Sequence, residues 1–382
     1  MFQSYFLTQD QSYAIIYLLE LTTLLFIADQ GESFFLPFYK IGGLIVPFFF
    51  EKLKYTDETI KTWESNGPSL KKSKDVGEIM KSPSTDEKFI EILESDEGEY
   101  KLFFSESDKE KALEFLKYNN YYNFVIFPKL LLKSRKNSFN DALALFYIDD
   151  FIRKEVSYFS SKIEQWIKTS LAYSLSHQYE STEYAKAECY LDPNLYTSSR
   201  VCREILVHFE ETINNSREEF IIHHHKNRNG CIPIWVLVEE LTFGQIDYFI
   251  SGLNSEYKTQ WAKDTVGKEF QTFLVSWVSV VRHLRNIAAH HGRFYARKYT
   301  VLPKLTKEDQ REYKIKKNED KNTMFVNLLI LKNLVSFHPN ETIIEWNNFI
   351  ETLDNKVEEN LEIIDMKKLG FFEKWDIALK IL

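Results

Sequence analysis

The stretch between Pro128 and Pro193 contains no glycine and no proline, and it constrains the fold more than any other feature. Within it, apolar residues recur at steps of three and four from Leu145 to Leu171. This spacing places them on one face of a helix, whereas a half-buried strand would need strict alternation. The sequence therefore predicts one helix between about 139 and 178, in a mainly α-helical protein.

The region before this helix, residues 1–105, has a different composition. It contains an apolar run at 14–28, an aromatic stretch at 34–50 and a polar, turn-rich linker at about 63–88. We expect both apolar segments to be buried elements of a small N-terminal domain of unknown role, with contact at a membrane surface as the alternative. Stable membrane insertion is not expected, because the run at 14–28 is short and contains Glu20.

The region from 106 to 305 is predicted to be helical almost throughout. Its first helix has the pattern of a capping box, with Ser107 at the N-cap and Glu110 three residues later. Turn-forming residues predict breaks at 192–194, at 227–233 and around Gly252. Residues 306–382 follow as a helical tail rich in lysine and glutamate, with apolar patches.

Charge and cysteine content exclude several classes of protein. The net charge is −8 and the pI is near 5.7, so nucleic acid would have to bind at a local patch rather than over the whole surface. Cys189, Cys202 and Cys231 are too few and too far apart for a disulfide framework or a zinc knuckle. They fit a reducing cytoplasm, and the positively charged start of a signal peptide is missing.

One such patch is present late in the chain. The segment "VRHLRNIAAHHGRFYARK" occupies 281–298, and from 271 to 307 there are seven lysines and arginines and no carboxylate. Such a patch attracts phosphate. If a helix extends from 273 to 297, its apolar side docks on the core and its cationic side faces outward or into a cleft. The predicted phosphate contacts are Arg282, Arg293, Arg297 and Lys298.

Three residues of this segment, Arg285, Asn286 and His290, have the chemistry needed to cut RNA. An imidazole titrates near neutrality and can move the protons of the 2′-hydroxyl and of the leaving oxygen. A guanidinium matches phosphate oxygens, and Asn286 can orient the ring or bind phosphate. One helix supplies only one histidine in this register, so two copies facing each other would complete the site. No metal or other cofactor is expected.

Other candidate residues have simpler explanations. The pairs Arg203–His208 and Arg217–His223 have acidic neighbours that would compete for the arginine. His291 falls on the apolar side of the wheel and is expected in the core. The histidines at 223–225 lack a metal-ligand spacing and are expected at a helix end. The tryptophans are expected first in the core and only second as platforms for stacking bases: Trp166, Trp235 and Trp277.

The segment "LRNIAAHHGRFYAR" resembles the signature of the Abi-like (AbiD/AbiF) abortive-infection family, whose core is a HEPN ribonuclease domain. Further segments agree in order: "KALEFLKYNNYYNF" at 111–124, "YIDDFIRKEV" with Asp150 and Arg153, "SKIEQWIKTSLAYSLS" with Ile163 and Glu164, and "EEFIIHHHKNRNGCIPIWVLVEELTFGQI" at 218–246. Together they cover about 106 to 300. Residues 1–105 and the lysine-rich segment 130–140 do not match the family pattern.

The resemblance implies a HEPN-type helical bundle that acts as a metal-independent endoribonuclease, usually dimeric, in defence against phage. By position, Arg285, Asn286 and His290 carry over as the catalytic set, and Arg293 as a phosphate contact. A different class stays open: an RNA-binding module that holds a small regulatory RNA with little or no catalysis. A third class is a nucleotidyl-modified toxin partner. RNA is the expected partner in the first two, with a homodimer as the expected assembly.

Overall fold

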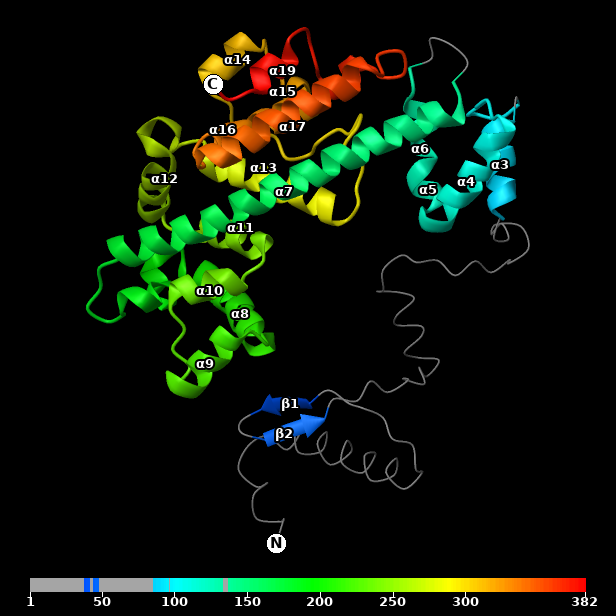
Figure 1. Ribbon diagram of the computed structural model, residues 1–382. Helices are drawn as coiled ribbons and strands as arrows, with labels where there is room; N and C mark the ends of the chain where they lie inside the picture. Colours follow the sequence, from blue (N-terminus) through cyan, green and yellow to red (C-terminus); the bar gives the residue numbers. More distant parts are fainter. Residues whose placement is uncertain (1–37, 42–43, 48–84, 96, 133–136) are drawn as a thin grey trace, which may run out of the picture. The chain divides into compact units, whose positions relative to one another are not determined.

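The computed structural model describes residues 38–41, 44–47, 85–95, 97–132 and 137–382 (Figure 1). Contacts divide the chain into two compact units, Met1–Ser82 and Pro83–Leu382. In the first unit, β1 (Phe38–Ile41) and β2 (Leu44–Pro47) form an antiparallel hairpin in which Tyr39 pairs with Val46. This hairpin falls within the aromatic stretch at 34–50. The apolar run at 14–28 and most of the predicted linker lie outside the described residues.

The second unit is built from helices, which confirms the mainly α-helical fold class. In chain order they are α3 (Asp86–Glu94), α4 (Glu106–Tyr118), α5 (Tyr121–Phe124), α6 (Ile126–Leu130), α7 (Phe139–Gln178), the 3-10 helices η1 (Lys186–Leu191) and η2 (Pro193–Leu195), α8 (Ser199–Asn215), α9 (Glu219–Asn227), α10 (Ile234–Glu240), α11 (Phe243–Gly252), α12 (Ser255–Phe270), α13 (Leu274–Ala289), α14 (Lys307–Glu312), α15 (Asn318–Lys321), α16 (Met324–Val335), α17 (Asn340–Glu358), α18 (Met366–Leu369) and α19 (Trp375–Leu379). None of the described helices is both long and apolar enough to span a membrane.

Helix α7 confirms the long helix predicted between 139 and 178. It is 40 residues long and begins at a capping box, in which Ser138 and Asp141 each accept the other's backbone N–H. The predicted apolar stripe is buried along its length, and Leu145 and Leu171 at its two ends are both 0% exposed. Figure 1 shows α7 crossing the whole helical unit. The other long helices are therefore arranged around it.

Helices α10, α12, α13, α16 and α17 all pack against α7. Helices α7 and α13 run in opposite directions, since Glu164 lies beside Arg285 while Asp149, a little over four turns earlier, lies beside Phe294. Helix α16 is buried along most of its surface and contacts both α7 and α13. The predicted C-terminal tail is helical and contributes to the same hydrophobic core.

The predicted breaks are found close to where turn residues placed them. Helix α9 ends at Asn227 before α10 begins at Ile234, and α11 ends at Gly252. The predicted capping box of α4 is wrong by two residues. Ser105, not Ser107, is the N-cap, and Asp108 completes the box by accepting the Ser105 N–H at 3.0 Å. Asp108 also accepts a hydrogen bond of 2.6 Å from Asn140, which fixes α4 against the start of α7.

Candidate functional site

The candidate site lies at the C-terminal end of α13. The buried side of this helix carries Val281, Leu284 and Ile287, at helical spacing, against the core. Arg285 and Asn286 lie on its last turns and are half-buried. This division of apolar and polar faces agrees with the predicted wheel as far as the helix extends.

The helix ends earlier than the wheel assumed. Its last residue is Ala289, and His290 is the C-cap. His291 takes the left-handed conformation with φ of 53°, and its N–H bonds to Ala288 O at 3.1 Å. The N–H of Gly292 bonds to Ile287 O at 2.8 Å, which completes a Schellman motif. The prediction of a helix from 273 to 297 is therefore wrong beyond Ala289, because this motif stops it.

Gly292 is the feature of the sequence that indicates this end of the helix. A Cβ on Gly292 would lie 2.9 Å from Ile287 Cγ2, so the close turn needs glycine. Because the chain leaves the helix here, the wheel does not apply to residues beyond Ala289. His291, predicted in the core, is exposed beside the exposed His290, and that prediction is wrong.

After the turn, the chain is held against α7 by Asp149, which is 0% exposed. Its Oδ1 accepts the backbone N–H groups of Phe294 at 2.8 Å and Tyr295 at 2.6 Å. Its Oδ2 accepts a hydrogen bond of 3.2 Å from Arg153, which also donates to Asp150 at 2.7 Å. Burial raises the pKa of Asp149, although these three donors oppose the shift. Asp150 and Arg153 form the ion pair expected from the resemblance. The buried carboxylate that Arg153 also contacts belongs to Asp149, the residue before Asp150.

Further hydrogen bonds hold the segment 293–299 in place. The Arg293 guanidinium donates to Tyr295 O, and that of Arg297 donates to Arg293 O at 3.1 Å. The Tyr295 hydroxyl accepts the N–H of Asp365 at 2.9 Å, and the Tyr299 hydroxyl donates to Phe294 O at 3.3 Å. Burial lowers the pKa of Arg293. Among the four predicted phosphate contacts, the Arg293 side chain therefore binds within the segment, whereas the Lys298 side chain is exposed.

The cationic stretch has no carboxylate along the sequence, but carboxylates reach it from other helices. Asp247 of α11 binds Arg282 Nε at 2.6 Å. Glu164 of α7, which is 13% exposed, lies 3.4 Å from Arg285 Nε. The inference that these two arginines lack acidic neighbours is therefore wrong, because it counted only neighbours in the chain.

The contact at Glu164 is one link of a longer chain of polar groups. Its other oxygen lies 3.6 Å from Lys168 Nζ, one helical turn further along α7. Lys168 in turn donates to the backbone carbonyl of Glu239, in α10, at 3.3 Å. Arg285 is thus connected through α7 to α10.

His283, to which the sequence pattern assigns no role, lies on α13 one residue after Arg282. Its ring is half-buried, and burial, followed by the charges of Arg297 and Arg282, lowers its pKa. A lowered pKa keeps an imidazole neutral near pH 7. The position of His283 inside the cationic stretch is the sequence feature that could have indicated a role for it.

The other candidates from the sequence lie elsewhere. Glu204 pairs with Arg200 at 2.8 Å rather than with Arg203, and His208 lies on the surface of the same helix. His224 lies at the end of α9, as predicted for the histidine run, and its Nδ1 bonds to Cys231 O at 2.8 Å. Across residues 85–95, 97–132 and 137–382, and the hairpin, no group of three or more His, Cys, Asp or Glu side chains is placed to hold a metal ion.

Residues 114–296 match the model of the Abi-like protein family. This segment of the chain belongs to the Abi-like family. The Abi-like segment begins within α4, includes α7 and α13, and ends just beyond Tyr295, inside the 106–300 span of the predicted resemblance. It contains Arg285, Asn286 and His290. Membership in the Abi-like family implies a part in abortive-infection defence. No curated protein and no solved structure matches the chain.

Proposed function

We propose that this Abi-like protein is a metal-independent endoribonuclease of the HEPN type, which cuts RNA by attack of the 2′-hydroxyl. The observation that carries the proposal is the end of α13. A guanidinium, an amide and an exposed imidazole, those of Arg285, Asn286 and His290, are grouped there within little more than one turn. These groups match the needs of phosphoryl transfer in RNA.

His290 is the proposed proton carrier. It is exposed at the C-cap of α13, so a strand of RNA can reach its ring. An imidazole can take the proton of the 2′-hydroxyl, whose oxygen then attacks the adjacent phosphorus. The bond from phosphorus to the 5′-oxygen breaks, and that oxygen takes up a proton. The products are a 2′,3′-cyclic phosphate and a free 5′-hydroxyl.

Arg285 is the proposed partner of the phosphate. Its side chain is 40% exposed, and Glu164 contacts it through Nε. Within the described part of the chain, no hydrogen bond engages its two terminal nitrogens, so they can form a fork to phosphate oxygens. Glu164 thus orients the guanidinium without occupying the nitrogens that would bind the substrate.

Arg297 and Lys298 are proposed to bind the flanking phosphates, together with Arg282 and Arg293. Lys298 is exposed and lies three residues after Tyr295, whose backbone N–H binds Asp149. Arg282 resembles Arg285, since its carboxylate partner also contacts Nε. Arg293 is half-buried and already donates one N–H to Tyr295 O, so its share is expected to be the smallest.

Catalysis is expected to need two copies of the chain, because each contributes one His290 and cleavage has two proton transfers. The specific activity should fall on dilution, in step with the loss of dimer in sedimentation experiments. Mixing the parent with a His290→Ala chain should lower activity per parent chain, since mixed dimers lack one imidazole. Full activity at concentrations where only monomer sediments would overturn this expectation, and would direct attention to the neighbouring His291.

The proposed function is tested by the ends of the products. Labelled single-stranded RNA and a DNA oligonucleotide of the same sequence are incubated with the full chain, with and without EDTA, and the products are identified by mass spectrometry. We expect RNA to yield 2′,3′-cyclic phosphate ends at the same rate with EDTA. DNA should bind through the same phosphates yet stay whole, because it lacks the 2′-hydroxyl.

Two results would contradict the proposal. Cleavage that EDTA abolishes, with 5′-phosphate ends, would show a metal-dependent nuclease. RNA that is bound but never cut, at any protein concentration, would show an RNA-binding module.

A further inference from the structure

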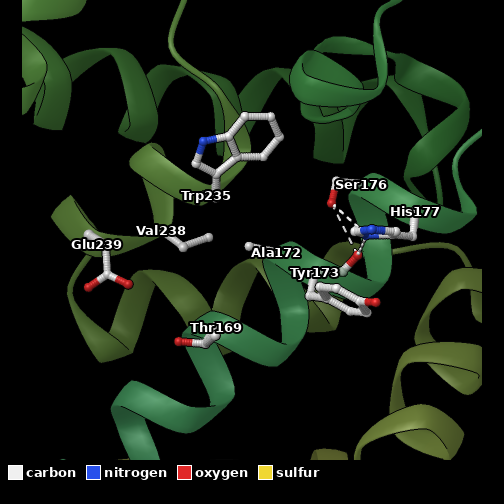
Figure 2. Close-up of a pocket in the computed structure, with 8 residues that line it drawn as sticks. All are labelled: Thr169, Ala172, Tyr173, Ser176, His177, Trp235, Val238 and Glu239. Carbon is white, nitrogen blue, oxygen red and sulfur yellow. Dashed lines mark hydrogen bonds between the residues drawn. The ribbon is translucent and has the colours of Figure 1, made fainter.

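A pocket of about 310 Å³ lies between α7 and α10 (Figure 2). Its floor is apolar, because Ala172 and Val238 are both buried. Figure 2 shows Trp235 of α10 across from Tyr173 of α7, with Ala172 between them. The pocket is therefore a slot with an aromatic ring on each side.

Both rings are unusually open to solvent. Trp235 is 51% exposed and Tyr173 is 65% exposed. The expectation that Trp235 lies in the core is wrong, whereas Trp277 of α13 is fully buried as expected. Exposed aromatic rings that face a slot are the usual means of holding single-stranded nucleic acid, since every base offers a flat face for stacking.

Tyr173 is held in position by its own helix. His177, one turn later, stacks on its ring with centroids 4.0 Å apart and an interplanar angle of 27°. The His177 Nδ1 donates to the Tyr173 carbonyl at 2.8 Å, which fixes the imidazole. One wall of the slot is thus rigid before any ligand arrives, which lowers the cost of binding a flat ring.

A carboxylate stands at the edge of the slot. Glu239 lines the pocket and is exposed, and among the described residues its side chain has no ion-pair or hydrogen-bond partner. A carboxylate accepts N–H groups and repels carbonyl oxygens. The Watson–Crick edge of guanine offers adjacent N–H donors, whereas uracil places a carbonyl on each side of its single N–H. We propose that this pocket binds one base of the RNA strand, and prefers guanine to uracil.

The position of the pocket relative to Arg285 fits a base on the strand that is cut. Glu164 holds Arg285, and Lys168 links Glu164 to the backbone of Glu239. From Glu164 to Tyr173 the rise along the axis of α7 is about 14 Å, with the two side chains about half a turn apart around the helix. This rise is shorter than the stretch of ~4–16 nucleotides that single-strand-binding sites cover. The proposal rests on the proposed function only in taking RNA as the substrate.

The test measures binding without cleavage, on the full chain carrying His290→Ala. The probes are fluorescein-labelled oligouridines, either unmodified or with one guanosine, followed by fluorescence anisotropy. The guanosine probe is expected to bind about tenfold more tightly than oligouridine. Adding Glu239→Gln should remove most of that difference, because an amide presents both a donor and an acceptor. Adding Trp235→Ala should weaken both probes by about tenfold through lost stacking.

Matched controls are available for both substitutions. Glu240→Gln changes the adjacent acid on α10, which lines a different pocket, and should leave the preference intact. Tyr118→Ala removes a ring that is 84% exposed on α4 and should leave affinity unchanged. The proposal falls if Glu239→Gln keeps the preference for guanosine, or if Trp235→Ala binds like Tyr118→Ala.

The alternative occupant is a second copy of the chain. If Trp235→Ala is monomeric where the parent is dimeric, the slot is a contact between copies and the proposal falls. Its failure is distinguishable from that of the proposed function, because binding and cleavage are measured separately. If the chain cuts RNA but binds both probes equally, only the proposed base pocket is contradicted. If the chain prefers guanosine but never cuts RNA, only the proposed enzymatic function is contradicted.

Discussion

Replacement of His290 by alanine is expected to lower the rate of RNA cleavage by about 10²–10⁴-fold, the usual cost of losing a positioned acid or base. The fold should be unaffected, because the ring is exposed and only the backbone N–H of His290 takes part in ending α13. Single-turnover cleavage of end-labelled RNA measures the rate, and thermal unfolding of the same samples checks the fold.

His291 provides the matched control, since it is the next residue and is equally exposed. Asparagine tolerates the left-handed conformation that His291 adopts, so His291→Asn keeps the turn while removing the imidazole. This variant should retain most of the parental rate. Parental activity in His290→Ala, or an equal loss in His291→Asn, would show that the histidine has been assigned wrongly.

Asp149→Ala is expected to destabilise the folded protein by about 3–5 kcal/mol, the cost of removing one partner of a buried charged pair. Three donors lose their acceptor: Arg153 and the backbone N–H groups of Phe294 and Tyr295. The segment that carries Arg293 and Arg297 would also lose its attachment to α7. RNA cleavage should therefore fall even at temperatures where the variant stays folded. Urea unfolding gives the change in free energy of unfolding.

Asp150→Ala is the control for this effect. Asp150 contacts the same arginine at 2.7 Å, but its side chain is 55% exposed. Exposed ion pairs contribute at most about 1 kcal/mol. If the two variants lose the same stability, the buried acceptor is not what holds the segment in place.

The spacing of residues along the sequence predicted well those features that depend on a single helix. The bounds of α7 followed from the absence of glycine and proline and from its apolar stripe, and the buried face of α13 followed from its periodicity. The end of α13 was misplaced because the wheel was extended through Gly292, although a glycine after a helix is the usual sign of its end. The misplaced core position of His291 followed from the same error.

Contacts between distant segments could not be predicted in this way. No pattern near Arg282 or Arg285 indicates Asp247 or Glu164, which lie far away along the chain. The exposure of Trp235 depends on how α10 packs against α7, and it too has no local signature. Even the resemblance to Abi-like proteins, which pointed to Asp150 and Arg153, did not distinguish the buried Asp149 from its exposed neighbour.

Helix α7 carries Asp149, Glu164 and Tyr173 on one uninterrupted run of backbone. Their separations are therefore set by residue count rather than by loop conformation. Inserting or deleting one residue between two of these positions would turn everything beyond it by about 100°. Length changes within α7 are thus far more damaging than substitutions that keep it helical, and viable insertions in relatives of this protein should fall outside it, in connections such as the one between α7 and η1.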